Sequence, residues 1–286
     1  MAEFVQKIGL NPLTLTIRGR LVELCRPLVM GILNLTPDSF YAGSRETDAQ
    51  AAALRARKMI EEGADIIDIG ACSTRPGSAP VSEEEEMMRL EGPLTEIRRA
   101  LPKAVISVDT FRSSIARECM ARLGVEIIND ITGGADPAMY ATVASAGACY
   151  ILMHNRGASA SAHPSENYGP DVVADVVSEL AFKVNEARKA GICNLIVDPG
   201  FGFAKDTGQN YAILSRLECL KELGCPILVG LSRKRMAREA CGCDVADSLV
   251  PTVALNTVAL MKGAFIIRVH DVKEGVMTVK TIEALI

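Results

Sequence analysis

Eight short apolar runs are spaced along the chain, and they constrain the fold more than any other feature of the sequence. They occupy residues 28–33, 64–70, 104–108, 126–129, 148–153, 194–197, 226–231 and 264–269. Each run is apolar on consecutive rather than alternate positions, which is typical of strands that are covered on both faces. The runs therefore predict a parallel sheet buried between helices.

The segments between these runs carry helical patterns. Residues 83–101 and 172–190 repeat apolar side chains at three- and four-residue intervals, with charged residues on the opposite face. Strand–helix alternation repeated eight times predicts a single α/β domain over residues 1–286, a (β/α)8 TIM barrel, since such barrels contain about 250 residues. A doubly wound open sheet is the alternative. Residues 13–24 alternate about Arg18 and Gly19 and predict an N-terminal β-hairpin under the barrel floor.

Composition restricts the classes of partner. The chain has a formal net charge of −4, no long basic run and no Trp, which argues against a nucleic-acid partner. No segment has the ~18 uninterrupted apolar residues of a membrane span, and the first ten residues lack the apolar core of a signal peptide. The nine cysteines are scattered without a CxxC pair, which is typical of reduced thiols. We therefore expect a soluble cytoplasmic protein without a membrane partner.

Each apolar run ends in, or is followed by, a hydrophilic residue or loop, at the end where the strands of a barrel converge. These positions are Asn34, Gly70 with the loop STRPGS (73–78), Asp109, Asn129, Asp130, His154, Asp198, Ser232, Arg233, Lys234, Arg268 and His270. Taken one at a time, Asp109, Asn129 and Ser232 could be helix N-caps. Capping does not account for an Arg, a Lys and two His at one rim, so the whole pattern predicts a functional site.

The predicted site lacks the motifs of common catalysts. There is no GxSxG or HExxH motif, no His/Cys spacing that suits zinc and no GxxxxGK[ST] loop. What remains is a set of carboxylates, an amide and cations: Asp109, Asn129, Asp198, Arg75, Lys234 and Arg268. Carboxylates accept hydrogen bonds from paired N–H groups, whereas Arg and His bind phosphate. This combination suits a neutral heterocycle that carries an anionic tail.

Seven strings resemble the motifs of the dihydropteroate synthase family, in the family's order and spacing. They are MGILNLTPDSF (30–40), STRPGS (73–78), VDTFR (108–112), NDITGG (129–134), DPGFGFAKD (198–206), GLSRK (230–234) and RVHDV (268–272). The resemblance implies a homodimeric (β/α)8 barrel that is a target of sulfonamides and uses Mg²⁺. It also implies the family's reaction, in which p-aminobenzoate is joined to 6-hydroxymethyl-7,8-dihydropterin diphosphate with release of pyrophosphate on the way to folate.

The resemblance also implies residue roles, carried over position by position. Pterin contacts would come from Asp109, Asn129, Met153, Asp198, Phe203 and Lys234. Arg268 and His270 would hold the diphosphate, and Asn34 would be the Mg²⁺ ligand. Thr74, Arg75 and Pro76 lie in a loop that would close over p-aminobenzoate, with further substrate contacts from Ser232, Arg233 and Arg235. The implied catalytic set is Asp109, Asp198, Lys234, Arg268 and His270.

The chemistry of this reaction fits these residue types. An aniline nitrogen is neutral and nucleophilic at pH 7, so the difficult step is breaking the carbon–oxygen bond to diphosphate. We therefore expect a dissociative displacement in which Mg²⁺, Arg268 and His270 stabilise the leaving group.

Some positions depart from the family pattern. Ala71–Cys72 stands where Gly-Glu is common, and Arg235 stands where a Ser often meets the substrate carboxylate. A backbone N–H at that helix N-terminus could still bind the carboxylate.

Two other functions stay open. A methyltetrahydrofolate-dependent methyltransferase also holds a pterin in a barrel, but it binds no diphosphate and does not require Asn34, Lys234 or the pair Arg268 and His270. An inactive paralogue would have lost charged rim residues, and none is missing.

Overall fold

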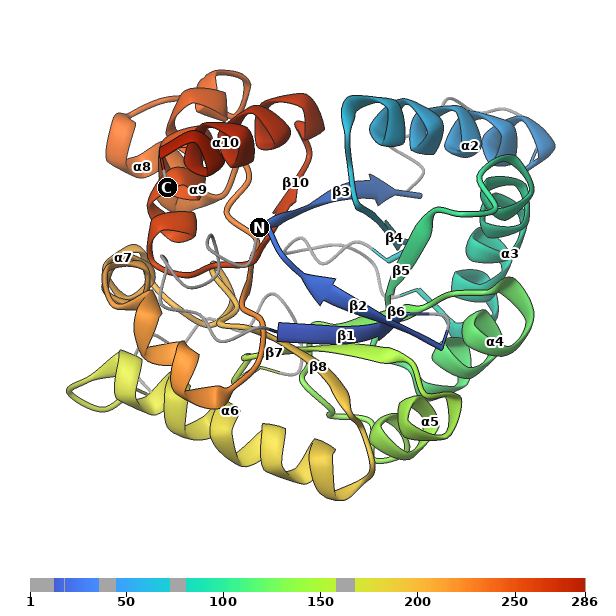
Figure 1. Ribbon diagram of the computed structural model, residues 1–286, viewed down its shortest axis with the longest axis horizontal. Helices are drawn as coiled ribbons and strands as arrows, with labels where there is room; N and C mark the ends of the chain where they lie inside the picture. The colour runs from blue at the N-terminus through green and yellow to red at the C-terminus, as the bar shows by residue number, and fades with distance from the viewer. Residues whose placement is uncertain (1–12, 18, 36–44, 73–80, 158–167, 286) are drawn as a thin grey trace.

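Eight parallel strands form a barrel in the computed structural model, which describes residues 13–17, 19–35, 45–72, 81–157 and 168–285 (Figure 1). The strands are β3 (Leu28–Asn34), β4 (Ile66–Gly70), β5 (Val105–Asp109), β6 (Ile127–Asp130), β7 (Cys149–Met153), β8 (Asn194–Asp198), β9 (Leu228–Val229) and β10 (Ile266–Val269). They are hydrogen-bonded in the order β8-β7-β6-β5-β4-β3-β10-β9, and a parallel bridge between Val197 and Ile227 closes the circle. The predicted barrel is confirmed, and closure excludes the open sheet.

Helices surround the strands as an outer ring (Figure 1). They are α2 (Arg45–Glu62), α3 (Glu83–Ala100), α4 (Ser113–Leu123), α5 (Met139–Ala146), α6 (Val172–Lys189), α7 (Thr207–Ser215), α8 (Arg235–Cys241), α9 (Leu249–Met261) and α10 (Val272–Leu285), with 3-10 helices η3 (Leu217–Leu223) and η4 (Ala246–Ser248). Helix α3 begins after Ser82, whose Oγ accepts a hydrogen bond from the Glu85 N–H at 3.2 Å. Both helices predicted from periodicity, α3 and α6, are confirmed.

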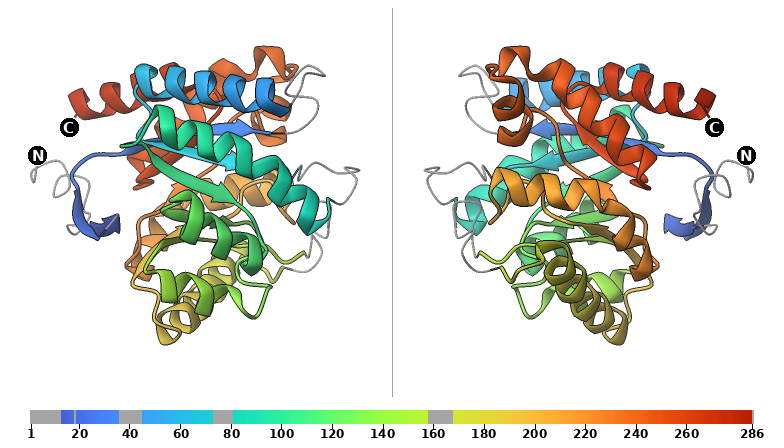
Figure 2. Two further views of the ribbon diagram at one scale, coloured as in Figure 1. Left: turned by 90° about the vertical axis from the view of Figure 1, so that its right-hand side faces the viewer. Right: turned by 90° about the vertical axis from the view of Figure 1, so that its left-hand side faces the viewer.

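The N-terminal hairpin covers one end of the barrel (Figure 2). Strands β1 (Leu13–Ile17) and β2 (Arg20–Leu24) pair antiparallel. Leu15 and Leu24 are buried against the apolar interior of the barrel, and the Thr16 N–H donates to Asn194 Oδ1 at 2.8 Å. Because Asn194 is the first residue of β8, the hairpin lies at the N-terminal end of the strands, as predicted.

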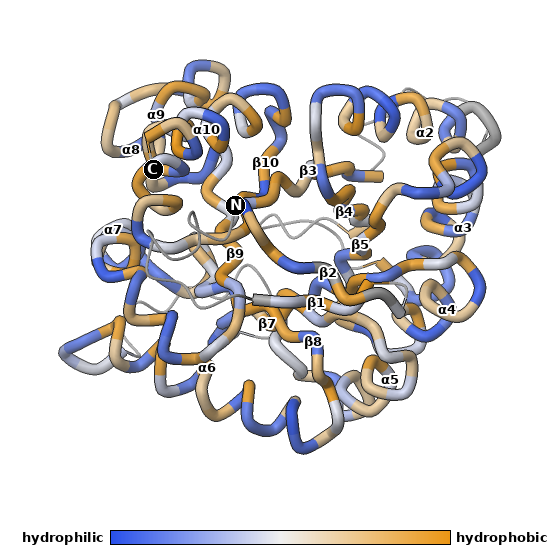
Figure 3. Tube along the Cα trace, in the orientation of Figure 1, coloured by the Kyte–Doolittle hydropathy of each residue, from blue (hydrophilic) through white to orange (hydrophobic). Residues whose placement is uncertain are grey.

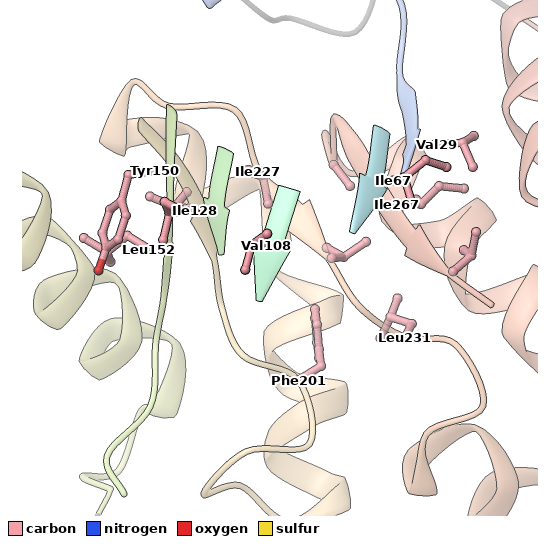
Figure 4. Close-up of a cluster of buried hydrophobic side chains, with 14 of the residues drawn as sticks. Val29, Ile67, Val108, Ile128, Tyr150, Leu152, Phe201, Ile227, Leu231 and Ile267 are labelled. Atoms are coloured by element: carbon pink, nitrogen blue, oxygen red, sulfur yellow. The ribbon is translucent and has the colours of Figure 1, made fainter. Parts of the chain in front are cut away.

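Alternation along each strand divides the core into two layers and positions the site. Outward side chains such as Ile67, Val108 and Ile128 pack under the helices (Figure 4). Hydrophobic residues predominate in the barrel strands, whereas the helices alternate hydrophobic and hydrophilic residues (Figure 3). Inward side chains are apolar near the hairpin, for example Ile66 and Ile127. Farther along the strands the inward side chains become polar, so the hydrophilic residues collect at the C-terminal mouth.

Within the described ranges, no single helix has the length and composition of a membrane span. Only the bent pair Arg235–Cys241 and Ala246–Met261, whose helices meet at 96°, passes that test together.

All nine cysteines are free thiols, including the fully buried Cys119 and Cys149.

Candidate functional site

Side chains from four strands meet around Asp68, a carboxylate that the sequence analysis did not single out. Arg268 Nε on β10 donates to Asp68 Oδ2 at 2.6 Å, and Arg268 Nη2 donates to Asp109 Oδ2 at 3.1 Å. Asn129 Nδ2 on β6 also donates to Asp68 Oδ2, at 3.1 Å. The predicted residues Asp109, Asn129 and Arg268 therefore form one hydrogen-bonded cluster.

Asp198, at the end of β8, faces the same space. It is 7% exposed, and its Oδ1 accepts a hydrogen bond from the Gly200 N–H at 2.7 Å. Burial raises the pKa of Asp198, and the positive charges of Lys234, Arg268 and Lys205 oppose that rise. These charges act on Asp198 only because they lie near it, so Asp198, Lys234 and Arg268 share one site, as predicted.

Lys234 and two apolar residues form the side of the site next to Asp198. Lys234 Nζ donates to the Phe201 carbonyl and lies 4.7 Å from the centre of the Phe203 ring. Burial lowers the pKa of Lys234 to about 8, and the charge of Asp198 works against this shift. Met153 ends β7 directly opposite Asp198 in the strand register and is 3% exposed. The structure therefore brings Met153, Phe203 and Lys234 to the predicted pocket.

Lys205 is a second residue that the sequence analysis missed. It is 2% exposed, and its Nζ donates to the carbonyls of Gly200 and Phe203, both at 3.1 Å. Burial lowers the pKa of Lys205 to about 7, while the charge of Asp198 opposes this effect. Asn210 supports the same loop, because its Oδ1 accepts from the Gly202 N–H at 2.8 Å. Lys205 lies inside the glycine-rich, apolar motif DPGFGFAKD. A lysine in such a motif was the sequence signal that could have indicated a buried cation near Asp198.

Ser232 and His270 lie together at the rim. Ser232 Oγ and His270 Nδ1 are 3.0 Å apart, and the His270 N–H donates to Ser232 Oγ at 3.3 Å. His270 is exposed at the rim, and desolvation of its ring together with the positive charge of Arg268 lowers its pKa to about 4. His270 is therefore a neutral hydrogen-bonding group near pH 7. Ser232 is not a helix cap, since Lys234 is the N-cap of α8.

The structure directs Arg233 and Arg235 elsewhere. Arg233 has a positive φ of 56°, and its guanidinium donates to both carboxylate oxygens of Asp271 at 2.9 Å. Arg235 is exposed and lies 3.5 Å from Glu239 one turn along α8. Neither side chain belongs to the cluster around Arg268, so their substrate contacts stay predictions.

His154, the other histidine expected at the rim, faces the opposite way. Its side chain is 1% exposed and its Nε2 lies 3.0 Å from Glu179 Oε2 on α6. Burial lowers the pKa of His154 to about 4. The preceding residue, Met153, points into the barrel, so alternation turns His154 into the layer between strand and helix. The expectation of two histidines at the mouth is therefore wrong, and His270 alone is there among the described residues.

Asn34 lies at the mouth, at the end of β3. A side chain at Gly70 would meet Asn34 Oδ1 at 3.7 Å and Asp109 Cβ at 3.5 Å, so the missing side chain leaves a small cradle between an amide oxygen and a carboxylate. Oxygen donors of this kind fit Mg²⁺, which keeps much of its shell for water and phosphate. The described ranges contain no group of three or more His, Cys, Asp or Glu that could hold a metal. Thr74, Arg75 and Pro76 lie outside the described residues.

We expect the variant Gly200→Ala to unfold more easily and to lose function. Gly200 has a φ of 69°, and an added Cβ would lie 2.1 Å from the His154 carbonyl oxygen. Strain and overpacking together should lower the free energy of unfolding by about 3–5 kcal/mol. Chemical denaturation measures this change. The matched control is Gly242→Ala, where φ is 61° and nothing lies within 4 Å, so the cost should be only about 1 kcal/mol. Equal costs at both positions would contradict the role of the close contact.

Comparison with known proteins connects this geometry to a family. The model of the family described as "Pterin binding enzyme" matches residues 30–270. The dihydropteroate synthase of Bacillus subtilis is 41% identical, over 91% of this chain and 89% of its own length. The mitochondrial folate synthesis bifunctional protein of Arabidopsis thaliana is 42% identical over 90% of this chain, which spans about half of that relative's length, 49%.

Solved structures agree with these relatives. The dihydropteroate synthase of Xanthomonas albilineans with 4-aminobenzoic acid has a TM-score of 0.88 and 37% identity, and the match covers 96% of this chain and 98% of the other. The same enzyme in complex with 7,8-dihydropteroate gives a TM-score of 0.84 and 36% identity, with the same coverage. Fold and site together define a (β/α)8 barrel of the pterin-binding class. Within that class, the chain belongs to the dihydropteroate synthase family.

Proposed function

We propose that this protein condenses p-aminobenzoate with 6-hydroxymethyl-7,8-dihydropterin diphosphate to give 7,8-dihydropteroate and pyrophosphate. The observation that carries the proposal is the convergence of Asp198, Lys234 and the cluster of Asp109, Asn129 and Arg268 at one mouth. Acceptors for a heterocycle and donors for an anion lie side by side there. The ligands named for the Xanthomonas albilineans structures support the same two halves of the reaction.

The pterin would lie against the acidic side of the site. Asp198 would accept hydrogen bonds from the 2-amino group and N3–H, because a carboxylate matches two parallel N–H donors. Asn129 and Asp109 would bind the rest of the ring's polar edge, and Lys234 would donate to its carbonyl side. Phe203 and Met153 would contact its faces.

The diphosphate would lie against the basic side. In the displacement the methylene carbon–oxygen bond breaks, the electron pair leaves with pyrophosphate, and the p-aminobenzoate nitrogen forms the new carbon–nitrogen bond before losing a proton to water. Arg268 and His270 would stabilise the charge that grows on the leaving oxygen, where each donor can contribute about 3–4 kcal/mol. A dissociative path follows because the dihydropterin delocalises the positive charge left on the methylene carbon.

We further propose Mg²⁺ as the cofactor, held by Asn34 beside Gly70. In the described part of the site, the cations Lys205, Lys234 and Arg268 already lie beside the carboxylates of Asp68, Asp109 and Asp198, which offset much of their positive charge. A bound diphosphate therefore needs additional positive charge. When present, Mg²⁺ supplies that charge and polarises the phosphate oxygens.

The proposed reaction predicts pyrophosphate release that depends on both substrates. Protein, Mg²⁺ and the pterin diphosphate are mixed with or without p-aminobenzoate, and free pyrophosphate is followed with time. Release should require p-aminobenzoate, fall to background after chelation of Mg²⁺, and decrease when a sulfonamide competes with p-aminobenzoate. No release with both substrates would favour an inactive paralogue. Methyl transfer from methyltetrahydrofolate to a corrinoid would instead identify the methyltransferase alternative.

We also propose a homodimer formed through the α9–α10 face, defined by the exposed residues Val250, Val258, Met261 and Met277. Their side chains are 76%, 40%, 59% and 58% exposed, although the two helices pack against each other on the barrel. Exposed apolar residues gathered on two neighbouring helices are typical of interfaces.

The variant Val250→Glu should shift the protein from dimer to monomer, because it places a charge in that face. Analytical ultracentrifugation at micromolar concentration measures the change. The matched control is Phe182→Glu on α6, a side chain that is 67% exposed away from this face, and it should stay dimeric. A monomeric wild type would contradict the proposal.

We propose that the protein works in the reducing environment of the cytoplasm. All nine cysteines are free thiols, and proteins of oxidising compartments usually pair theirs.

A further inference from the structure

Asp68 occupies a position that no ligand at the mouth reaches directly. It lies in the middle of β4, one inward position before Gly70, and its side chain has no exposed surface. Asp109, the other partner of Arg268, lies at the end of β5 and its side chain is 16% exposed. The two carboxylates that pair with Arg268 therefore differ in depth. Asp109 can contact a ligand, whereas Asp68 lies deeper in the barrel than Asp109.

The contacts of Asp68 determine where Arg268 points. Arg268 Nε and Nη2 both lie 2.6 Å from Asp68 Oδ2, and Nη2 also reaches Asp109. This pairing uses one edge of the planar guanidinium. Nη1 has no hydrogen bond with any described residue, so the opposite edge is available to an anion. A guanidinium held along one edge is oriented before the ligand arrives.

Asn129 depends on the same oxygen. Its Nδ2 donates to Asp68 Oδ2 at 3.1 Å, and Asn129 is 4% exposed. An amide whose nitrogen is held in this way keeps its Oδ1 in a defined direction. One buried carboxylate thus fixes the orientation of a cation on β10 and an amide on β6, the two predicted contacts for opposite ends of the substrate.

We infer that Asp68 is a positioning residue, which holds Arg268 and Asn129 in their binding orientations and leaves Asp109 free to exchange Arg268 for the pterin. The inference rests on the proposed function for its substrate but concerns a residue that does not touch that substrate. Such supporting contacts are what keep a site within the small tolerances that catalysis and binding need.

The test is the variant Asp68→Asn, which keeps the shape of the side chain and removes its charge. Calorimetry with Mg²⁺ and pyrophosphate should show an affinity about 10- to 100-fold weaker than wild type, since the anion then meets an unoriented guanidinium. The KM for p-aminobenzoate should change less than about 3-fold, because that substrate is not bound by Arg268 or Asn129. The matched control is Ser107→Ala. Ser107 is the register partner of Asp68 on β5, is fully buried, and has no hydrogen-bond partner for its Oγ among the described residues. This control should bind pyrophosphate like wild type.

A double-mutant cycle separates positioning from general stability. If Asp68 acts through Arg268, pyrophosphate should bind the double variant Asp68→Asn/Arg268→Gln as weakly as Arg268→Gln alone. Additive losses, or an Asp68→Asn variant that binds pyrophosphate like wild type, would overturn the inference.

A measurement on wild type covers the case in which Asp68→Asn does not fold. In ¹⁵N-labelled protein the Arg268 Nε–H should exchange slowly with solvent, and rapid exchange would overturn the inference. Calorimetry with pyrophosphate and hydrogen exchange at Arg268 need no turnover, so they test the inference independently of the KM for p-aminobenzoate. The double-mutant cycle could show coupling between Asp68 and Arg268 while wild type releases no pyrophosphate from the pterin diphosphate. That result would contradict the proposed function and leave the role of Asp68 intact.

Discussion

Replacing Arg268 with alanine is expected to lower kcat for the proposed condensation by about 100- to 1000-fold, the usual effect of removing one donor to a developing charge. The guanidinium is held along one edge by Asp68, and its Nη1 has no hydrogen bond with any described residue, so it can donate to the departing diphosphate. Steady-state kinetics with saturating p-aminobenzoate measure the change. The variant His270→Ala should have a smaller effect, because the neutral imidazole contributes one hydrogen bond at the rim. Near-normal turnover by the double variant Arg268→Ala/His270→Ala would contradict the role proposed for both.

The same substitution should also destabilise the fold. Removing Arg268 leaves the buried Asp68 and the partly exposed Asp109 as neighbouring carboxylates without their hydrogen-bonded cation, and removing one partner of a buried ion pair costs about 3–5 kcal/mol.

The variant Arg98→Ala is the matched control for Arg268→Ala. Arg98 pairs with the buried Glu126, just before β6 at the opposite end of the barrel, and its side chain is 23% exposed against 20% for Arg268. It should lower stability by a similar amount while the folded protein keeps its kcat. Loss of kcat in both variants would show that stability, rather than charge at the mouth, controls turnover.

Replacing Asp198 with asparagine should weaken pterin binding by about 1000-fold, because two charge-assisted hydrogen bonds of roughly 1.5–3 kcal/mol each are replaced by one acceptor and one misplaced donor. Removing the carboxylate also leaves Lys234 and Lys205 without the anion that both face. Calorimetry with 6-hydroxymethylpterin, which cannot react, isolates binding from turnover.

The control for this variant is Asp206→Ala, at the far end of the same loop. Asp206 caps α7 through the Gln209 N–H at 2.7 Å. Losing the cap should lower stability by about 1 kcal/mol without changing pterin affinity. If Asp198→Asn bound the pterin within 3-fold of wild type, the assignment of the pterin to this side of the mouth would be wrong.

Local sequence patterns were sufficient to predict the barrel and most of its rim. Apolar runs located every barrel strand, although β9 is only Leu228–Val229 within the predicted 226–231. Strand ends located Asp109, Asn129, Asp198 and Arg268, because a parallel barrel brings all its C-terminal ends to one mouth. Asp68 gives no such signal, because the apolar run ADIIDIG predicts only a buried strand around it. Charged residues are rarely buried unless they are paired, so an aspartate in the middle of a buried strand is itself an indication of function.

The sequence by itself determined the alternation of strands and helices and the family, since these depend on periodicity and on motifs that are local in the chain, whereas the closure of the barrel was settled by the bridge between Val197 and Ile227. Only the tertiary structure decided which polar side chains cooperate. Asp68 and Arg268 are 200 residues apart in the chain and 2.6 Å apart in space, while His154 and Arg233 lie next to site residues in sequence and point elsewhere. The physical reason is that side-chain direction follows from strand register and backbone φ, and the pairing of buried charges follows from barrel closure. None of these can be read from a single segment.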